Sequence, residues 1–250
     1  MKIGILKEQD ENRVALVPET VKKLIDEGNE VVAEKNCGLK AMLSDELYVE
    51  AGAKMVDRKE VLSSAQLICA IHPLQSEALA SMQPGTVYVT SLQPFVSLEK
   101  TEEASKAKLT VMSLDMIPRI TIAQSMDILS SMASIAGYKA VIRSADQLPR
   151  YFPMLTTAAG SIPPAKVLVL GAGVAGLQAI ATAKRLGAVV EAFDTRLAAR
   201  EEVESLGARF VEVEGARDDK AAGGYAVEQT EEYKQKQREL IHERAVRSDV

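Results

Sequence analysis

The residues with the clearest chemical potential are three glycines, Gly171, Gly173 and Gly176, and an acid, Asp194, that follows the last of them by 18 residues. Glycine at the first position lets the chain turn sharply, at the second lets the backbone approach a pyrophosphate, and at the third lets a helix pack close to a sheet. A carboxylate at this distance is placed to accept ribose hydroxyls. These residue types and spacings predict a dinucleotide-binding site.

The elements that must position these residues are a strand, a helix and a second strand. Val167–Leu170 is a short, partly β-branched apolar run of the length of a buried strand. An amphipathic helical pattern follows the glycines as far as Leu186, and Gly187 ends it. Val189–Phe193 is a second apolar run, and Asp194 is the next residue. Because a helix that begins at the glycines offers free N–H groups and a partial positive charge, we expect the phosphates at this turn.

The acid also predicts which nucleotide is bound. A carboxylate at Asp194 would repel a 2′-phosphate, so the sequence favours NAD(H) over NADP(H). Arg196 complicates this prediction, because an arginine near the ribose can accommodate that phosphate. A glycine-rich packing turn without a ligand is the alternative for the whole motif. The residues expected to contact the cofactor are Gly171, Gly173, Val174, Ala175, Gly176, Asp194, Thr195 and Arg196.

The rest of the chain predicts an α/β protein with two Rossmann-like, doubly wound parallel-sheet domains. In the first half, short apolar runs alternate with helical patterns, and no GxGxxG occurs. We expect an N-terminal domain over residues 1–127 and an NAD-binding domain over 128–250, joined by a connecting helix over about 124–147. Residues 151–164, rich in Thr, Ala, Gly and Pro, are expected to form a loop, and Arg209–Val213 a third strand of the second domain.

The second domain is expected to be truncated at its C-terminus. A polar, flexible loop is predicted over 215–224 and a charged helix over 229–247, and the chain ends at Val250, where a fourth strand would begin. A six-stranded dinucleotide domain needs a second mononucleotide half to complete its cleft. We therefore expect a fragment, a truncated product or one piece of a split protein.

Composition and charge argue against several classes of protein. Of the 250 residues, 47% are apolar and 26% charged, and the formal net charge of −5 gives no indication of nucleic-acid binding. Cys37 and Cys69 form no CxxC, and without a signal peptide they favour reduced thiols in a cytosolic compartment. His72 and His242 are far apart, and no metal-ligand spacing is present. The longest apolar region is the nucleotide motif, whose glycines and short strand argue against a membrane helix.

Three segments resemble one protein family. The segments Asp115–Lys139, DMIPRITIAQSMDILSSMASIAGYK, and Ile162–Arg196 are similar to the NAD(H)-binding α-subunit domain of proton-translocating NAD(P) transhydrogenase. The opening, MKIGILKEQDENRVALVPETV, resembles both that subunit and the related alanine dehydrogenases. The similarity covers essentially the whole chain, and the family's own domain is longer.

The resemblance implies an activity and partners. It implies hydride transfer from NADH on this chain to NADP⁺ on a separate NADP(H)-binding β subunit, coupled to proton translocation by membrane domains that this chain lacks. Such a transfer depends mainly on positioning two nicotinamide rings and needs little acid–base chemistry. The resemblance also implies a homodimer in a cytoplasmic location, associated peripherally with the inner membrane through partner subunits.

The resemblance assigns further site residues by position. The family holds an Arg, a Gln, an Asp and a Ser around the nicotinamide and carries a Gly-Tyr-Ala on a mobile loop, and the residues that match here are Arg119, Gln124, Asp127, Ser130 and Tyr225. The counterpart of Gln124 reaches toward the second nucleotide. From residue type alone, Arg119 could equally be a surface cation. Gln124 and Asp127 could be helix caps, Ser130 a packing residue and Tyr225 an ordinary loop residue.

Two other functions stay open on the sequence alone. Alanine dehydrogenases use a Lys in a KVKEP-like segment and a His in a YLHLA-like segment. The corresponding segments here, Cys69–Pro73 and Thr90–Pro94, lack the Lys and place Gln93 at the His position. Arg13, in an opening shared with alanine dehydrogenases, could bind a substrate carboxylate or form an internal salt bridge. The second alternative is a non-catalytic NAD-binding or assembly module.

Overall fold

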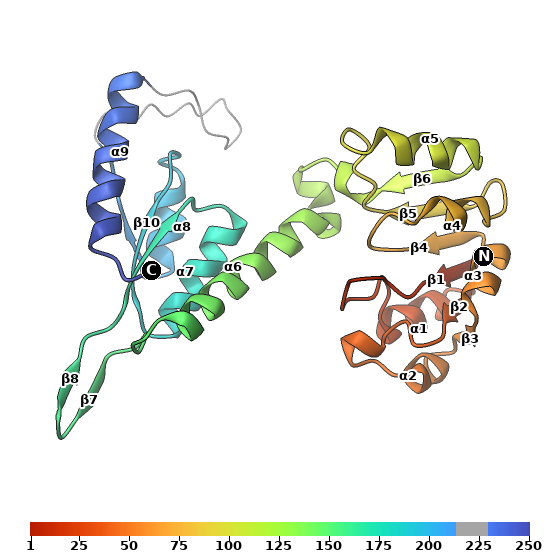
Figure 1. The fold of residues 1–250 in the computed structure, drawn as a ribbon, viewed down its shortest axis with the longest axis horizontal. Helices are drawn as coiled ribbons and strands as arrows, with labels where there is room; N and C mark the ends of the chain where they lie inside the picture. Colours follow the sequence, from red (N-terminus) through yellow and green to blue (C-terminus); the bar gives the residue numbers. More distant parts are fainter. Residues whose placement is uncertain (214–229) are drawn as a thin grey trace. The chain divides into compact units, whose positions relative to one another are not determined.

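The computed structural model describes residues 1–213 and 230–250. The chain divides into two compact units, unit 1 from Met1 to Ile128 and unit 2 from Leu129 to Val250. Each unit is built on a parallel sheet with helices between successive strands (Figure 1). The predicted fold class, α/β with two Rossmann-like parallel-sheet domains, is confirmed.

Unit 1 contains a six-stranded sheet in which all the paired strands are parallel. The strand order is β3-β2-β1-β4-β5-β6, so the order reverses between β1 and β4. In sheets of this kind, ligands bind outside the carboxyl ends of the strands at the point of reversal. The strands are β1 Lys2–Ile5, β2 Glu30–Glu34, β3 Lys54–Val56, β4 Leu67–Cys69, β5 Val87–Thr90 and β6 Thr110–Ser113.

Helices connect these strands. The first begins at Pro18, which is favoured in a first turn because it has no N–H to leave unpaired, and its Val21 is fully buried. The chain then leaves this helix through Gly28, whose φ of +88° is a conformation that suits glycine. The helices of unit 1 are α1 Pro18–Asp26, α2 Asp45–Glu50, α3 Arg58–Ser64, α4 Ser76–Ala80 and α5 Leu98–Lys106, with the 3₁₀ helices η1 Leu39–Ala41, η2 Leu114–Met116 and η3 Thr121–Met126.

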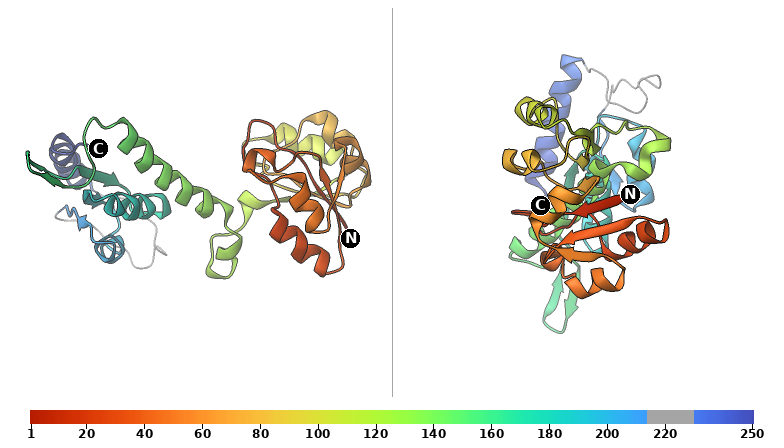
Figure 2. Two further views of the ribbon diagram at one scale, coloured as in Figure 1. Left: turned by 90° about the horizontal axis from the view of Figure 1, so that it is seen from below. Right: turned by 90° about the vertical axis from the view of Figure 1, so that its right-hand side faces the viewer.

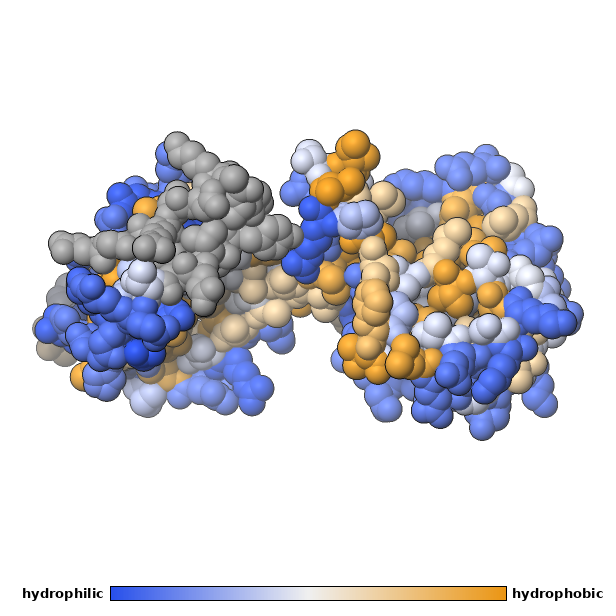
Figure 3. Space-filling model, turned by 90° about the horizontal axis from the view of Figure 1, so that it is seen from above, coloured by the Kyte–Doolittle hydropathy of each residue, from blue (hydrophilic) through white to orange (hydrophobic). Residues whose placement is uncertain are grey.

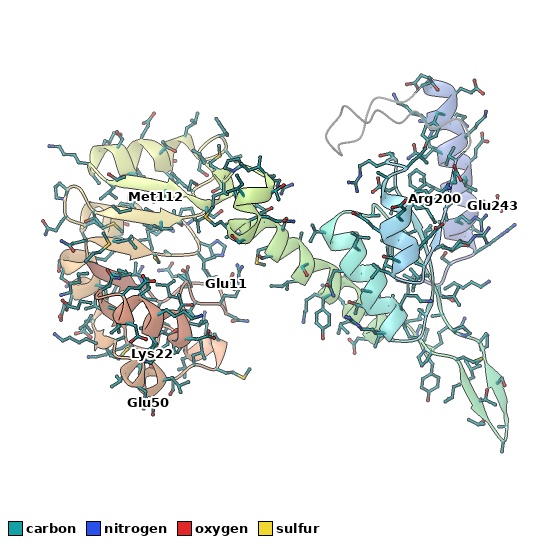
Figure 4. All side chains as sticks on the ribbon, turned by 180° about the vertical axis from the view of Figure 1, so that it is seen from behind. Glu11, Lys22, Glu50, Met112, Arg200 and Glu243 are labelled. Carbon is teal, nitrogen blue, oxygen red and sulfur yellow. The ribbon has the colours of Figure 1, made fainter. Side chains whose placement is uncertain are left out.

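The two halves of this sheet are covered differently. On β1 and β2 the side chains of both faces are buried, among them Ile5 and Val32. On β4 to β6 one face is buried, with Ile68 and Tyr88 fully enclosed, whereas side chains of the other face are partly exposed. Met112 of β6, labelled in Figure 4, is 55% exposed on that second face. Among the described residues, this second face is packed at β4, where Leu67 and Cys69 contact the core, and becomes exposed toward β6.

Unit 2 contains a three-stranded parallel sheet in the order β11-β10-β9. A buried cluster that includes Val167, Ile180, Val190 and Val203 joins this sheet to α7 and α8. The third strand is shorter than the predicted Arg209–Val213. The elements of this sheet and its helices are α6 Ile128–Gln147, β9 Lys166–Leu170, α7 Val174–Arg185, β10 Val189–Phe193, α8 Ala199–Ser205, β11 Arg209–Phe210 and α9 Glu231–Val246.

The prediction of a loop over residues 151–164 was wrong, because this segment contains a β-hairpin. β7 (Leu155–Thr157) and β8 (Gly160–Ile162) pair antiparallel. Figures 1 and 2 show the hairpin projecting from the rest of unit 2. All but one of the residues in its two strands are exposed. Neither face of the hairpin therefore requires apolar residues, and its sequence lacks the apolar–polar alternation by which a half-buried strand is recognised.

The helix predicted over about 124–147 begins later than expected. α6 runs from Ile128 to Gln147. Gln124 lies in the preceding 3₁₀ helix, and Asp127, with φ −75° and ψ 92°, is extended between the two. Asp127 therefore directly precedes α6, and Gln124 lies outside it.

Membrane-spanning helices and metal clusters are both absent from the described ranges. Within residues 1–213 and 230–250, no helix combines the length and apolar character that crossing a membrane requires. The same residues hold no group of three or more His, Cys, Asp and Glu side chains arranged to hold a metal ion.

Candidate nucleotide site

The turn between β9 and α7 is sharply bent and open on one side. Gly171 follows β9 with φ +95°, a conformation that strains any residue with a side chain. At Gly173 an added Cβ would meet no atom within 4 Å, so the turn leaves space for a ligand there. At Gly176 a Cβ would lie 1.8 Å from the carbonyl oxygen of Gly171, so only glycine lets α7 pack this closely against the strand end. Of the other predicted turn residues, Val174 is 46% exposed and Ala175 is half-buried.

α6 packs against the first turn of α7 through another glycine. A Cβ on the buried Gly137 would lie 2.0 Å from the carbonyl oxygen of Ala175, a backbone atom that no side-chain rotation can move away. Nearby on the same two helices, Ser134 Oγ donates to Gln178 Oε1 at 3.4 Å. The amino end of α7, where free N–H groups can meet phosphate, is therefore held by Gly176 on the strand side and by Gly137 on the α6 side.

Asp194 follows β10 and reaches back to the glycine turn. Its Oδ2 accepts from the backbone N–H of Ala172 at 2.7 Å, and its Oδ1 accepts from the backbone N–H of Arg196 at 2.8 Å. The guanidinium of Arg196 donates from Nε to Oδ1 at 3.0 Å and from Nη2 to Oδ2 at 3.1 Å. The same Nη2 also donates to the carbonyl oxygen of Ala172 at 3.2 Å. The predicted ribose-binding acid is thus fixed beside the turn by backbone and side-chain donors together.

These contacts shift the ionisation of the pair. Burial opposes ionisation of the Asp194 carboxyl, but the hydrogen bonds from Arg196 and Ala172 outweigh it and hold its pKa below the usual range. The hydrogen bond to Asp194 raises the pKa of the Arg196 guanidinium in turn. Asp194 is therefore a carboxylate at neutral pH. Thr195, also predicted to contact the cofactor, is half-buried between these two residues.

The four residues assigned to the nicotinamide lie on the segment after β6. Arg119 and Gln124 are exposed, Asp127 is half-buried, and Ser130 is half-buried in the first turn of α6. The backbone N–H of Asp127 donates to the carbonyl oxygen of Gln124 at 3.3 Å. The structure places Arg119, Gln124 and Asp127 in unit 1 and Ser130 in unit 2. Tyr225, assigned to a mobile loop, lies outside the described residues.

The same segment exposes large apolar side chains. Ile120 is 55% exposed, Ile122 is 88% exposed and Met126 is 55% exposed. Apolar groups, orange in Figure 3, reach the surface of unit 1. Apolar side chains are thus exposed on the same segment that carries Arg119 and Gln124.

Arg13 forms the internal salt bridge that was one of its two predicted roles. Its guanidinium contacts a carboxylate oxygen of Glu11, labelled in Figure 4, and the same oxygen lies 3.2 Å from Nε2 of His72. The hydrogen bond from Arg13 is the main cause that holds the pKa of Glu11 well below its usual range. In this arrangement Arg13 already has an acidic partner within its own unit.

Unit 1 also has a pocket at the carboxyl ends of β1 and β4. Its volume is about 620 Å³, and its lining includes Lys7, Glu8, Arg58 and His72. The loop after β1 has no glycine, and α1 begins only at Pro18. This pocket therefore lacks the turn and adjoining helix end that hold a pyrophosphate in dinucleotide-binding units.

Unit 1 contains an acid–arginine pair that the sequence did not predict. Glu34 ends β2, and its Oε2 accepts from the backbone N–H of Lys7 at 2.8 Å and from Nη1 of Arg58 at 2.9 Å. Lys7 is the second residue after β1, just as Ala172 is the second residue after β9. The signal available in the sequence was an acid at or directly after the end of the second strand, in chain order, of each parallel sheet: Glu34 ends β2, and Asp194 follows β10.

The fold and the glycine turn define a two-domain α/β protein of the Rossmann-like, dinucleotide-binding class. Residues 4–136 match the family model described as alanine dehydrogenase/PNT, N-terminal domain, and residues 140–250 match the one described as alanine dehydrogenase/PNT, C-terminal domain. The chain belongs to this family. The resemblance predicted from the three segments is confirmed.

Relatives in this family carry two names. The chain is 45% identical over 260 residues to a protein of Rhodospirillum rubrum named as the first portion of NAD(P) transhydrogenase subunit alpha, and the match covers 100% of this chain and 68% of that protein. It is 40% identical to NAD(P) transhydrogenase subunit alpha of Haemophilus influenzae, covering 100% of this chain and 49% of that protein. It is 33% identical to an alanine dehydrogenase of Staphylococcus epidermidis, and this match covers 82% of this chain and 56% of that protein. The chain thus spans about half to two thirds of the length of these relatives.

Two solved structures have the same fold. The crystal structure of transhydrogenase from Sinorhizobium meliloti matches with a TM-score of 0.82 and 44% identity over 85% of this chain and 64% of that chain. An L-alanine dehydrogenase matches with a TM-score of 0.73 and 28% identity over 84% of this chain and 60% of that chain.

Proposed function

We propose that this chain is the NAD(H)-binding component of an NAD(P) transhydrogenase. NADH lies on unit 2, with its pyrophosphate at the amino end of α7 and its adenosine ribose at Asp194. A hydride passes directly from C4 of the reduced nicotinamide to C4 of the NADP⁺ nicotinamide on a separate partner, which leaves NAD⁺ and NADPH. The observation that carries the proposal is the open glycine turn beside Asp194, in a chain 45% identical to a transhydrogenase alpha subunit.

The choice of NAD(H) over NADP(H) follows from charge. Asp194 is an ionised carboxylate beside the turn, so a 2′-phosphate on the adenosine ribose would lie next to a like charge, although Arg196, which pairs with this carboxylate, could also meet the phosphate. The ribose hydroxyls of NAD(H), in contrast, can donate hydrogen bonds to this carboxylate. The proposed transfer assigns no step to a metal or an acid–base residue, because positioning of the two rings supplies most of the catalysis.

The segment after β6 is proposed to hold the nicotinamide end. Arg119, Asp127 and Ser130 are assigned to binding NADH, and Gln124 is assigned to orienting the ring of the second nucleotide. The exposure of Gln124 and of Ile122 beside it supports a surface that faces a partner.

The proposed partners are an NADP(H)-binding β subunit and the membrane domain of the transhydrogenase. Proton translocation belongs to that membrane domain, and this chain associates with the cytoplasmic side of the membrane through its partners. A homodimer is also proposed from the resemblance, and light scattering at micromolar concentration tests it.

An alanine dehydrogenase activity is less well supported. Arg13, the residue available to bind a substrate carboxylate, is already paired with Glu11. The segment with Gln93 offers an amide where alanine dehydrogenases have a histidine, and an amide cannot take up the proton that amino-acid oxidation releases.

The experiment that tests the proposal measures binding and transfer together. The purified chain is titrated with NADH and NADPH by calorimetry and then mixed with an NADP(H)-binding transhydrogenase partner. We expect NADH binding well above NADPH binding, and reduction of NADP⁺ by NADH only when both proteins are present. Oxidation of alanine would favour the alanine dehydrogenase, and NADH binding without transfer would favour a non-catalytic module.

A further inference from the structure

We propose that Arg196 competes with the nucleotide for Asp194, so that NAD(H) binds only when the Arg196 guanidinium leaves the carboxylate. The inference rests on the proposed function, since it concerns the ribose of the same nucleotide. It makes Arg196 a determinant of NAD(H) affinity, with a role opposite to that of a phosphate ligand.

The acceptor positions of Asp194 are all occupied. A carboxylate offers about four lone-pair positions to hydrogen-bond donors. On Asp194 two are used by the backbone N–H groups of Ala172 and Arg196, and two by Nε and Nη2 of Arg196. A ribose that brings its 2′- and 3′-hydroxyls therefore finds no free acceptor on this acid.

The donors to Asp194 differ in how freely they can move. The backbone N–H of Ala172 belongs to the glycine turn, and that of Arg196 follows β10, so neither can leave without unfolding the site. The two guanidinium donors lie on a side chain that is 29% exposed and can rotate toward solvent. Two hydroxyls can thus replace two guanidinium N–H groups, with Asp194 still held by its two backbone donors.

Asp194 is also less exposed than the turn beside it. The glycine turn is open to solvent at Gly171 and Gly173, whereas Asp194 is only 8% exposed. A ribose that hydrogen-bonds to Asp194 must therefore reach a carboxylate that is largely enclosed in this structure. Here the guanidinium, which also bonds the carbonyl oxygen of Ala172, is one of the groups that cover the acid.

Unit 1 supports this inference independently. Glu34 makes the same type of contacts, with a backbone donor from Lys7 and a guanidinium donor from Arg58, although the loop beside it has no glycine turn. The acid–arginine pair is therefore a contact that the fold makes without a nucleotide site. In unit 2 a carboxylate–guanidinium contact, made there by the arginine two residues after the acid, falls on the residue proposed to bind the ribose.

The test compares the unmutated chain with Arg196→Ala. Alanine keeps the backbone N–H that orients Asp194 and removes only the competing guanidinium. Because a partly exposed ion pair contributes little net free energy, NADH should bind only about threefold to fivefold more tightly to the variant. For 2′-deoxy-NAD⁺, which brings one hydroxyl fewer, the gain over the unmutated chain should be smaller.

Arg200→Ala is the matched control. Arg200, labelled in Figure 4, is on α8, pairs with Glu212 and lies over the ring of Phe210, so its loss removes the same charge without touching Asp194. NADH affinity should not rise in this control. A second measurement follows the Arg196 Nε–H resonance in ¹⁵N spectra, whose exchange with water should speed up on addition of NADH.

The outcomes separate the inference from the proposed function. Arg196→Ala binding NADH as weakly as the unmutated chain, or more weakly, would overturn the inference while NADH binding itself stands. An Nε–H that stays protected in saturating NADH would overturn it as well. Absence of NADH binding in both proteins would overturn the proposed function, and the inference with it.

Discussion

At the scale of single residues, Asp194 combines burial with full hydrogen bonding, and this determines what its loss would do. Asp194→Ala removes the ribose acceptor and the negative charge, and it leaves the Arg196 guanidinium without its acid. NADH should bind at least about tenfold more weakly, or about 1.4 kcal/mol, whereas NADPH should bind more tightly because the freed arginine can meet the 2′-phosphate.

Calorimetric titrations of both nucleotides check this prediction. Glu212→Ala serves as a control, since it removes an acid whose partner Arg200 lies elsewhere on unit 2. A variant whose preference for NADH over NADPH equals that of the unmutated chain would show that Asp194 does not select the nucleotide.

A second residue-scale prediction concerns Glu11 and acid. Hydrogen bonds to Glu11, first from Arg13, lower its folded-state pKa far below the ordinary value of 4.5. A lowered folded-state pKa stabilises the protein above the ordinary value, and this stabilisation disappears as pH falls toward the folded-state pKa. Glu11→Gln should lower the free energy of unfolding by roughly 1 kcal/mol at pH 7.

Urea denaturation between about pH 7 and about pH 2.5 measures this difference. The gap between the two proteins should narrow below pH 4.5, because the unmutated carboxylate begins to protonate in the unfolded chain. A gap that stays constant over the whole range would mean that the charge of Glu11 contributes nothing.

At the scale of elements, the contact between α6 and α7 is the one most sensitive to a single methyl group. Gly137→Ala brings a Cβ within 2.0 Å of the carbonyl oxygen of Ala175, so the two helices must separate. Alanine favours an isolated helix by about 1 kcal/mol over glycine, but overpacking costs about 1–3 kcal/mol. We expect net destabilisation and weaker NADH binding, because the amino end of α7 loses one of its two supports.

Lys139→Ala, two residues along α6 on an exposed position, is the control. Urea denaturation and NADH titration of both variants provide the measurement. If Gly137→Ala is as stable as the unmutated chain and binds NADH equally, the close approach of the two helices has no part in the site.

Much of the fold could be predicted because its elements carry the right periodicity. Gly171 and Gly173 lie between β9 and α7, and Gly187 lies between α7 and β10, which are the positions where a tight strand–helix–strand unit requires glycine. The start of α6 could not be found in this way, because the apolar spacing continues through Thr121–Met126, where the chain forms a 3₁₀ helix instead. The β7–β8 hairpin left no pattern either, since neither of its faces packs on a core.

The candidate site was predictable to the level of residue type and no further. Spacing alone identified Asp194 and its neighbour Arg196, but it could not show that the guanidinium turns back onto the carboxylate. Side-chain direction depends on contacts with the turn at Ala172, which are not encoded by the distance between residues in sequence. The pair of Glu34 and Arg58 in unit 1 was missed for a different reason: 24 positions separate the two residues, and only the fold brings them together.

At the scale of the whole molecule, the proposed chemistry needs a second protein. The segment after β6 carries Arg119 and Gln124 among exposed apolar side chains such as Ile122. A surface of this composition suits a partner that excludes water from the two nicotinamide rings. The proposed roles of its polar residues are therefore of two kinds. Arg119 and Asp127 are proposed to bind the NADH of this chain, whereas Gln124 is proposed to orient the nicotinamide of the partner's nucleotide.

Gln124→Asn separates these two roles. It shortens the side chain by one methylene and keeps the amide, so an amide that orients the partner's ring would fall short of it. We expect the hydride-transfer rate to fall about tenfold or more, equivalent to about 1.4 kcal/mol in the barrier, with NADH affinity almost unchanged. Arg119→Ala and Asp127→Asn should instead weaken NADH binding together with the rate. Single-turnover transfer to the NADP(H)-binding partner, paired with NADH titration, measures both quantities. If the Gln124→Asn chain transfers hydride at the unmutated rate, the Gln124 side chain has no part in the transfer. The contribution of Gln124 is then structural, through its backbone carbonyl, which accepts a hydrogen bond from the N–H of Asp127.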